Sequence, residues 1–332
     1  VFTKRAVLDI AGRLERMGVR ASVIYGSLPP EIRRRQIRMF SGHETKVVVA
    51  TDAIGMGLNL PVKRIVFVHT SKFDGKNTRP LLAAEIKQIG GRAGRYGIYD
   101  TGYVNAVGQE GLDYIKEHFD EKEPDVSCVS LGFPQVLLDM DEPLDAILKI
   151  WKSVATEPPF EKISIEDMLF LYEKAYRDRK EIDGFEDKHM LYRMLTCSID
   201  IKNRDIVTLW LYYCKTYTAD ACLHFPALIM CSDSGLARYE TFYKMLDLYY
   251  QFSVRLGKNI DLERLDRERE KTEETIMRYL AKNKKEYIQK CQYCGSLLPL
   301  GASFRICDKC FAETRKSKGG RRHLWTGATA GG

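Results

Sequence analysis

The chain has 332 residues, too many for one compact core, so we expect two or three domains. Its formal net charge of +7 is compatible with a polyanionic partner, and no apolar run approaches the roughly 20 residues that cross a bilayer, so no membrane partner is expected. The nine cysteines include two C-x-x-C pairs, which favours reduced thiols and a bound metal over a disulfide framework.

Residues 1–108 alternate strand and helix patterns. Short runs of Val and Ile without polar alternation predict parallel strands that are covered on both faces. A helical period covers Ala6 to Met17, and Pro29-Pro30 opens a second helix. We expect a RecA-like α/β lobe over residues 1–120, a parallel sheet with helices on both faces. Its strands are predicted at 1–2, 22–25, 46–50, 64–68 and 102–107. The opening Val1-Phe2 is typical of the end of a core strand, so we expect the chain to be part of a longer protein whose upstream part holds any targeting signal.

From residue 109 helical patterns replace strand patterns. Residues 121–260 predict an all-α accessory domain whose aromatic stripes form its core rather than base-stacking platforms. Residues 261–290 predict a charged surface helix with a thin apolar seam. The helices of the accessory domain are expected at 135–154, 164–180, 187–200, 204–218 and 238–256.

Two C-x-x-C pairs lie twelve residues apart near the end of the chain. Cys291, Cys294, Cys307 and Cys310 can supply four thiolates in a tetrahedron, so residues 291–312 predict a small zinc ribbon. Four cysteines leave no open position, which indicates a structural Zn²⁺. A disulfide or redox pair is the alternative. Residues 313–332 form a basic, glycine-rich tail that we expect to be disordered and attractive to phosphate.

Two glycine-rich segments stand out within the lobe. The first runs from an apolar strand into Thr51-Asp52 and then Gly55-Met56-Gly57. The second begins at Gln88 and contains Arg92 and Arg95, which share one helical face and can approach a polyphosphate. Taken alone, the second segment could equally be a glycine-broken helix end with solvated arginines.

Together these segments resemble motifs V and VI of superfamily 2 helicases. The segments 23–30 and 50–60 resemble almost letter for letter the RNA helicase of the mitochondrial RNA degradosome and its bacterial relatives. The resemblance implies the second of two RecA-like lobes in an ATP-dependent RNA helicase of 3′-to-5′ polarity. ATP and Mg²⁺ would take most ligands from the first lobe, because this sequence contains no G-x-x-x-x-G-K-[ST] loop and no DExH-like box.

The resemblance also implies roles for individual residues. Arg95 is similar to the arginine finger that stabilises charge on the γ-phosphate, with Arg92 beside it. The nucleotide would further contact Gln88, Asp52, Gly57 and Gly91. The RNA backbone would contact Thr51, Gly55, Gly26 and Ser27.

Two other functions stay open at this point. The chain could be a non-catalytic nucleic-acid-binding adaptor with a degenerate lobe and a zinc ribbon, or a DNA translocase of the same superfamily. The expected partner is single-stranded RNA in the cleft between lobes, with an exoribonuclease as a further partner implied by the family. The zinc module favours the bacterial branch and a cytoplasmic location, with the mitochondrial matrix as the alternative.

Overall fold

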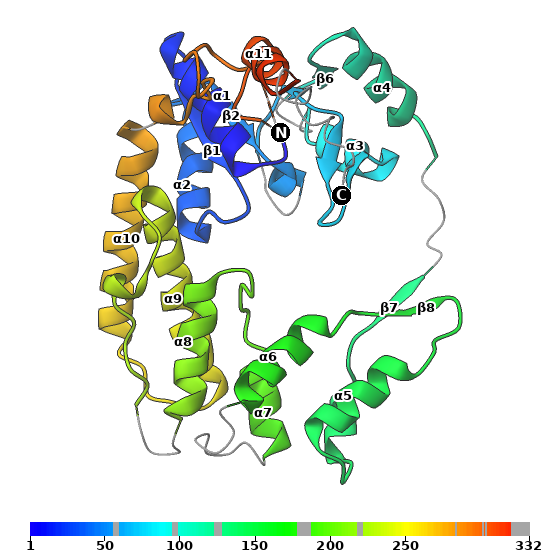
Figure 1. The fold of residues 1–332 in the computed structure, drawn as a ribbon, viewed down its shortest axis with the longest axis vertical. Helices are drawn as coiled ribbons and strands as arrows, with labels where there is room; N and C mark the ends of the chain where they lie inside the picture. The colour runs from blue at the N-terminus through cyan, green and yellow to red at the C-terminus, as the bar shows by residue number, and fades with distance from the viewer. Residues whose placement is uncertain are drawn as a thin grey trace, which may run out of the picture. The chain divides into compact units, whose positions relative to one another are not determined.

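The computed structural model describes residues 1–55, 60–94, 99–122, 128–177, 187–217, 222–282, 284–300, 302 and 304–319 (Figure 1). The chain divides into two compact units. Unit 1 comprises residues 1–123 and 280–332, and unit 2 comprises residues 124–279. Among the described helices, none is both long enough and apolar enough to span a membrane.

Unit 1 begins with a helix, a strand, a helix and a strand. The hydroxyl of Thr3 caps the first helix by accepting from the Ala6 N–H at 3.1 Å. The two strands pair in parallel, with Ile24 opposite Ala50, so that both end at the same edge. The elements are α1 (Lys4–Arg16), β1 (Ala21–Ile24), α2 (Pro30–Ser41) and β2 (Val47–Ala50).

The second half of the lobe adds another parallel pair and a short hairpin. Strand β3 (Arg64–Phe67) pairs with β6 (Tyr103–Ala106), while β4 (Ser71–Phe73) and β5 (Thr78–Pro80) are antiparallel. Ile86 and Phe67 are buried in the core that these strands share with α3. The remaining elements are the 3₁₀ turn η1 (Asp52–Gly55) and helices α3 (Ala83–Gly90) and α4 (Gln109–Phe119).

The expected single parallel sheet is wrong in one respect, because the strands of the lobe form two separate parallel pairs, β1–β2 and β3–β6. The edges of β2 and β3 line a hollow of about 1050 Å³ that Val1 and Phe2 also line. These two residues are not a strand, although the Val1 amino group donates to the Ala50 carbonyl at 3.2 Å. Two residues are too few to build a ladder between β2 and β3.

Unit 2 is largely helical, around a core centred on Trp210, which is fully buried and donates from Nε1 to the Met194 carbonyl at 3.0 Å. The expectation of an all-α region is wrong, because β7 (Val129–Leu131) and β8 (Phe160–Lys162) form a parallel pair. Strands of three residues are too short for their alternation to be recognised in a sequence. The other elements are η2 (Gln135–Asp139), α5 (Leu144–Ser153), α6 (Glu166–Tyr176), α7 (Lys188–Leu195), α8 (Arg204–Lys215), η4 (Leu228–Met230) and α9 (Gly235–Arg255).

The charged helix α10 (Leu262–Lys282) is shorter than the expected 261–290, and it is packed rather than a surface arm. Leu265 and Ile276 are fully buried, and Arg269 donates to the Asp247 carboxylate of α9 at 2.6 Å. The chain passes from unit 2 to unit 1 at residue 280, near the end of α10.

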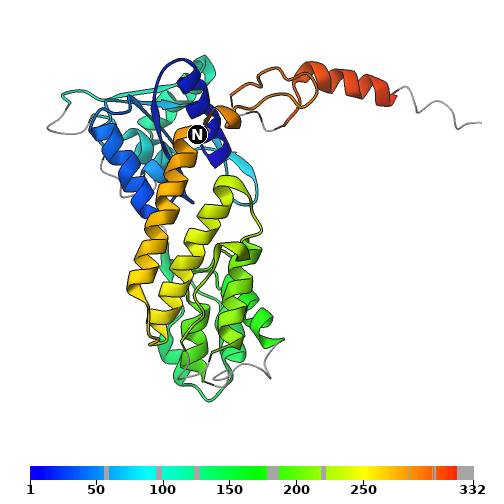
Figure 2. The same ribbon diagram turned by 90° about the vertical axis from the view of Figure 1, so that its left-hand side faces the viewer.

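The last described segment packs on the first helix of unit 1. The turn η5 (Lys284–Tyr287) lies against α1, and the Gln289 N–H donates to the buried Asp9 carboxylate at 2.8 Å. Helix α11 (Asp308–Gly319) follows, so the expected disorder from residue 313 is wrong as far as Gly319 (Figure 2). The rest of the basic tail lies outside the described residues.

Candidate functional site

The carboxyl ends of β1 and β2 bring two of the predicted segments together. A hollow at this edge is lined by Gly26 and Ser27 after β1 and by Thr51 and Asp52 after β2. The parallel register of the two strands causes this proximity, because it places Ile24 beside Ala50. Thr51 is buried, and its hydroxyl accepts from the Ala53 N–H at 3.3 Å, which folds the chain into η1. The edge of an open α/β sheet at which these residues meet is a frequent ligand site.

The two glycine-rich segments also meet, at Gly55. The guanidinium of Arg92 donates to the Gly55 carbonyl at 2.5 Å, across 37 positions of sequence. The Gln88 side chain of α3 also packs against η1, since a Cβ on Gly55 would lie in ordinary van der Waals contact with it at 3.4 Å. The structure therefore links the segment after β2 with the end of α3.

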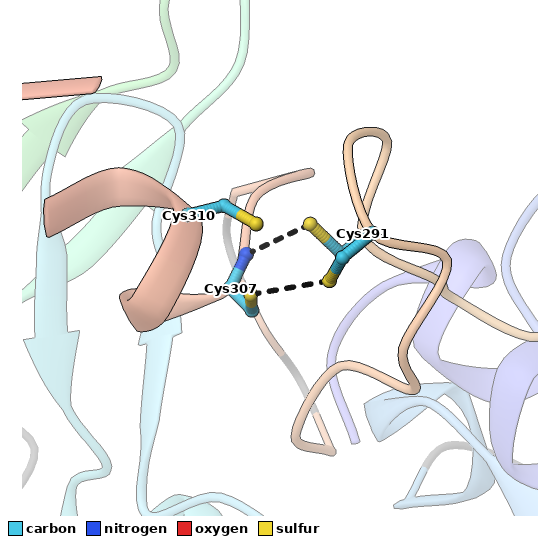
Figure 3. Close-up of side chains that lie close together, drawn as sticks. Cys291, Cys307 and Cys310 are labelled. Carbon is cyan, nitrogen blue, oxygen red and sulfur yellow. Dashed lines mark hydrogen bonds between the residues drawn. The ribbon is translucent and has the colours of Figure 1, made fainter. Parts of the chain in front are cut away.

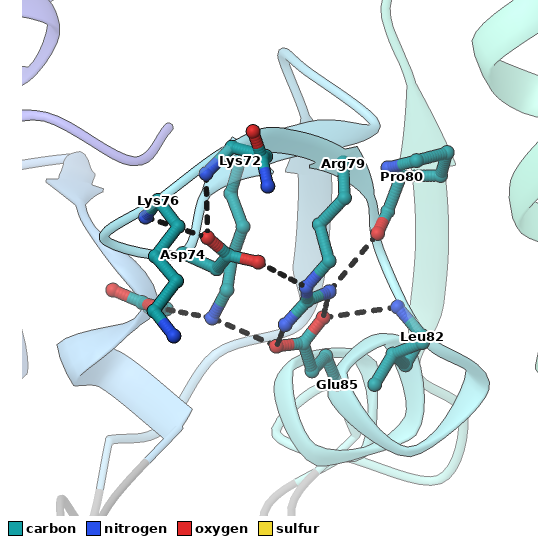
Figure 4. Close-up of polar contacts among 9 residues, drawn as sticks. Lys72, Asp74, Lys76, Arg79, Pro80, Leu82 and Glu85 are labelled. Atoms are coloured by element: carbon teal, nitrogen blue, oxygen red, sulfur yellow. Dashed lines mark hydrogen bonds and ion pairs between the residues drawn. The ribbon is translucent and has the colours of Figure 1, made fainter.

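Lys72 and Arg79 of the β4–β5 hairpin form a network of charges with Glu85 (Figure 4), and Asp52 joins it through Lys72. Lys72 lies 3.1 Å from the Asp52 carboxylate and 2.8 Å from the Glu85 carboxylate. Arg79 binds both Glu85 oxygens at 2.9 Å. The hydrogen bonds from Arg79, followed by those from Lys72 and the Leu82 N–H, lower the pKa of Glu85 to about 2. The hydrogen bond to Glu85, followed by that to Asp52, raises the pKa of Lys72.

No pattern in the sequence indicated this network. A signal was available in the spacing, because Glu85 lies three residues after Leu82, where a carboxylate can accept from the first backbone N–H groups of a helix.

The turn after α3 depends on two glycines that meet across the chain. Gly94 has φ of +73°, and a Cβ there would lie 2.5 Å from the Gly102 nitrogen.

The predicted nucleotide contact Gly91 is exposed, and its N–H donates to the Lys87 carbonyl at 2.7 Å. The predicted arginine finger Arg95 and the predicted contact Gly57 lie outside the described residues.

The four predicted metal ligands converge, and Figure 3 shows three of them, Cys291, Cys307 and Cys310, close together. Their sulfur atoms all lie within 4.8 Å of one another, and a zinc tetrahedron with bonds of about 2.3 Å places its sulfurs roughly 3.8 Å apart. Backbone N–H groups, first those of Cys294 and Cys307, lower the pKa of Cys291 to about 6, whereas burial raises the pKa of Cys310 to about 12. A bound cation would deprotonate both thiols.

The elements that carry these cysteines differ from the expected ribbon. The first pair lies in a turn that Gly295 permits with φ of +69°. The second pair lies at the start of α11, where Cys307 immediately precedes the helix and Cys310 is in its first turn. A single antiparallel bridge, Lys290 to Leu297, is the strand-like pairing among the described residues here. The donor set fits Zn²⁺, while the two-stranded ribbon is not observed in this part of the chain.

Comparison with known protein families finds a match for the first part of the chain. Residues 1–97 match the family described as "Helicase conserved C-terminal domain", and this stretch contains the hollow, η1 and α3. The first 97 residues of unit 1 thus match a helicase C-terminal domain.

Two of the similar proteins are named RNA helicases. The chain is 33% identical over 277 residues to "ATP-dependent RNA helicase SUV3, mitochondrial" of rice. This alignment covers 77% of this chain and 46% of the rice protein. It is 32% identical over 185 residues to "ATP-dependent RNA helicase SUPV3L1, mitochondrial" of chicken, covering 51% of this chain and 23% of that protein. The chain thus spans less than half the length of these relatives. A structure of Saccharomyces cerevisiae Dbp5 aligns with a TM-score of 0.31 and 24% identity over 37% of this chain and 32% of that one.

Proposed function

We propose that this chain supplies the second lobe of an ATP-dependent RNA helicase that moves 3′ to 5′ along one strand. The observation that carries the proposal is the meeting of Gly26, Thr51 and Asp52 at one sheet edge, with Arg92 tied to the adjoining turn. The relatives are named RNA helicases, which favours RNA over DNA as the substrate. The 332-residue sequence contains no phosphate-binding loop, so in this proposal the loop and the Mg²⁺ ligands come from a first lobe.

The RNA backbone would bind at the hollow after β1 and β2. Gly26 is exposed and has no atom within 4 Å of the position of a Cβ, so a phosphate can approach its backbone closely. Ser27 and Thr51 line the same hollow, and the turn η1 continues from it toward Gly55. Contacts to phosphate rather than to bases suit a motor that must move along any sequence.

The nucleotide would bind between this lobe and the first lobe, at the end of α3. We propose Arg95 as the arginine finger, with Gln88, Gly57 and Gly91 as further contacts. Arg92 is better placed as a positioning residue, because its guanidinium already holds the Gly55 carbonyl. Asp52, which pairs with Lys72, would link the RNA side of the lobe to the nucleotide side.

We propose that Zn²⁺ binds the four converging cysteines and has a structural role, because all four ligands come from the protein. The relatives are mitochondrial by name, so we propose a mitochondrial location in place of the expected cytoplasmic one. The exoribonuclease partner implied by the family stays a prediction, since neither the described residues nor the names of the relatives point to it.

Two variants of a protein that also carries the first lobe test the proposal. Arg95→Ala should reduce kcat for ATP hydrolysis by about 10³-fold or more with RNA affinity nearly intact, because the finger acts on charge that develops in the transition state. Thr51→Ala should weaken RNA binding or uncouple it from turnover, because its phosphate contact exists whether or not chemistry occurs.

The adaptor alternative predicts a different result for the same variants. There Arg95 is one more cation, and its loss would weaken RNA binding modestly and leave any ATP hydrolysis unchanged. Hydrolysis at the unmodified rate by Arg95→Ala under saturating RNA would therefore reject the proposed role of this residue.

A further inference from the structure

The cysteine module carries large aromatic side chains that the protein does not bury. Tyr293 is 61% exposed and Phe304 is 78% exposed, although each lies within three residues of a cysteine of the cluster. The core beneath them is small and consists of Leu298, Cys291 and Cys310 with a few partly buried neighbours. Isolated exposed aromatics are common, but two on so small a module call for a partner.

Hydrogen bonds hold the two segments that carry these rings side by side. The Gln292 N–H donates to the Arg305 carbonyl at 2.9 Å, and the Cys307 N–H donates to the Cys291 sulfur at 3.4 Å. From Cys291 to Gln292 the partner changes from Cys307 to Arg305, so the two segments run antiparallel. Tyr293 and Phe304 are the next residues along in each direction and lie at the same end of the module.

The segment of sequence that carries these rings is rich in positive charge. From Lys290 to the end, the chain contains eight Lys and Arg residues against two Asp and Glu, a formal charge of +6 out of +7 for the whole protein. Four thiolates and one Zn²⁺ would together add a charge of about −2, which leaves this segment distinctly positive. Arg305 adjoins Phe304, and Lys309 lies in the first turn of α11.

We propose that the cysteine module is a second binding site for single-stranded nucleic acid, in which Tyr293 and Phe304 stack on bases and Arg305 and Lys309 contact phosphates. Stacking on aromatic rings is tolerant of sequence because every base has a flat face, and a positive surround holds the backbone. The cysteine cluster fixes the two segments that present the rings. The module is joined to the lobe, since Arg13 of α1 donates to the Leu298 carbonyl at 2.7 Å, so it would hold a strand close to the helicase domain.

Binding of a labelled oligouridine of about 20 nucleotides to the full chain, followed by fluorescence anisotropy, tests this inference. The double variant Tyr293→Ala/Phe304→Ala should weaken binding on the order of 10- to 100-fold, because each stack contributes about 1–3 kcal/mol. The salt dependence of its binding should stay unchanged. Arg305→Gln/Lys309→Gln should instead reduce the slope of log K against log salt by about 0.7 for each phosphate that the variant no longer neutralises.

Three controls make the result decisive. Phe160→Ala/Tyr212→Ala removes two exposed rings of unit 2 and should bind as the unmodified chain does. An abasic oligomer should bind the unmodified chain and the module variant equally, because it cannot stack. One zinc per chain in the variant shows that the module is folded, and Tyr293→Leu/Phe304→Leu, which retains apolar bulk, should lose binding as well.

Unchanged affinity of the module variant for oligouridine would overturn the inference and leave the proposed helicase function intact, because that function rests on Thr51 and Arg95. Equal weakening on the abasic oligomer would also overturn it, since the rings would then act on the fold and not on bases. Full retention of affinity by the leucine variant would point to an apolar docking surface for a protein and overturn it too.

Discussion

The guanidinium of Arg92 lies 2.5 Å from the carbonyl oxygen of Gly55, and this hydrogen bond joins the two glycine-rich segments of the lobe. The hydrogen bond satisfies a backbone carbonyl in the turn that follows β2. It also fixes the end of α3 relative to that turn. A shift in the position of one segment therefore affects the position of the other through the Arg92 side chain.

Arg92→Ala should lower the free energy of unfolding of the chain by about 1.5–3 kcal/mol, the range for a hydrogen bond from a charged donor. RNA affinity should fall at the same time, because Gly55 loses its tether. Urea unfolding and oligouridine anisotropy measure the two effects. Arg34→Ala is the matched control, since its side chain is 66% exposed and pairs with the half-exposed Glu31 of the same helix. Unchanged stability of Arg92→Ala would show that this bond is dispensable.

Glu85 should make the chain sensitive to acid. Its pKa is about 2 in the folded chain against an ordinary 4.5, so its contribution is complete above pH 4.5 and is lost as the pH falls from 4.5 toward 2. Glu85→Gln should lower the free energy of unfolding at pH 7 by roughly 2 kcal/mol, with part of the shift lost to solvent screening. The variant should also show a flatter decline of stability than the unmodified chain between about pH 4.5 and 3. Parallel curves for the two proteins in this range would contradict the prediction.

Gly94→Ala should be strongly destabilising, by about 2–4 kcal/mol, because it combines a left-handed backbone with a contact of 2.5 Å to the Gly102 backbone. Thermal unfolding gives the measurement. Gly132→Ala provides the control, since no atom lies within 4 Å of the position of its Cβ, and it should change stability by less than about 0.5 kcal/mol.

The purified chain should contain one zinc, measured by elemental analysis. Cys307→Ser should abolish stoichiometric zinc, because three thiolates leave the tetrahedron incomplete. Cys222→Ser changes an exposed cysteine outside the cluster and should retain the metal. Zinc that persists in Cys307→Ser and disappears in Cys222→Ser would show that the ligands are wrongly assigned.

Hydrolysis of ATP by the 332-residue chain alone should not exceed background. The phosphate-binding loop and the acidic residues that hold Mg²⁺ are absent from this sequence, so neither the γ-phosphate nor the attacking water would be positioned. A coupled phosphate-release assay measures the rate. Steady ATP hydrolysis by this chain, abolished by Arg95→Ala, would contradict the proposal that the chain supplies one of two lobes needed for hydrolysis.

Local patterns were enough to predict the parallel strands β1, β2, β3 and β6 and the convergence of the four cysteines. An apolar run such as 47–50 predicts a strand at that position. Once β1 and β2 pair in parallel register, Thr51 and Gly26 follow the ends of neighbouring strands and lie close together. The C-x-x-C pairs similarly define two turns whose sulfurs can meet at one metal. In each case the information lies within a few residues of the site.

Only the tertiary structure decided which distant side chains would neutralise one another. Lys72 meets Asp52 and Glu85 because the β4–β5 hairpin folds over the start of α3, and no periodicity records that fold. Asp9 is fully buried on α1, where its Oδ1 accepts from Arg13 and from a backbone N–H 280 residues away. Burial of a charge requires partners, and the position of these partners depends on the packing of whole elements.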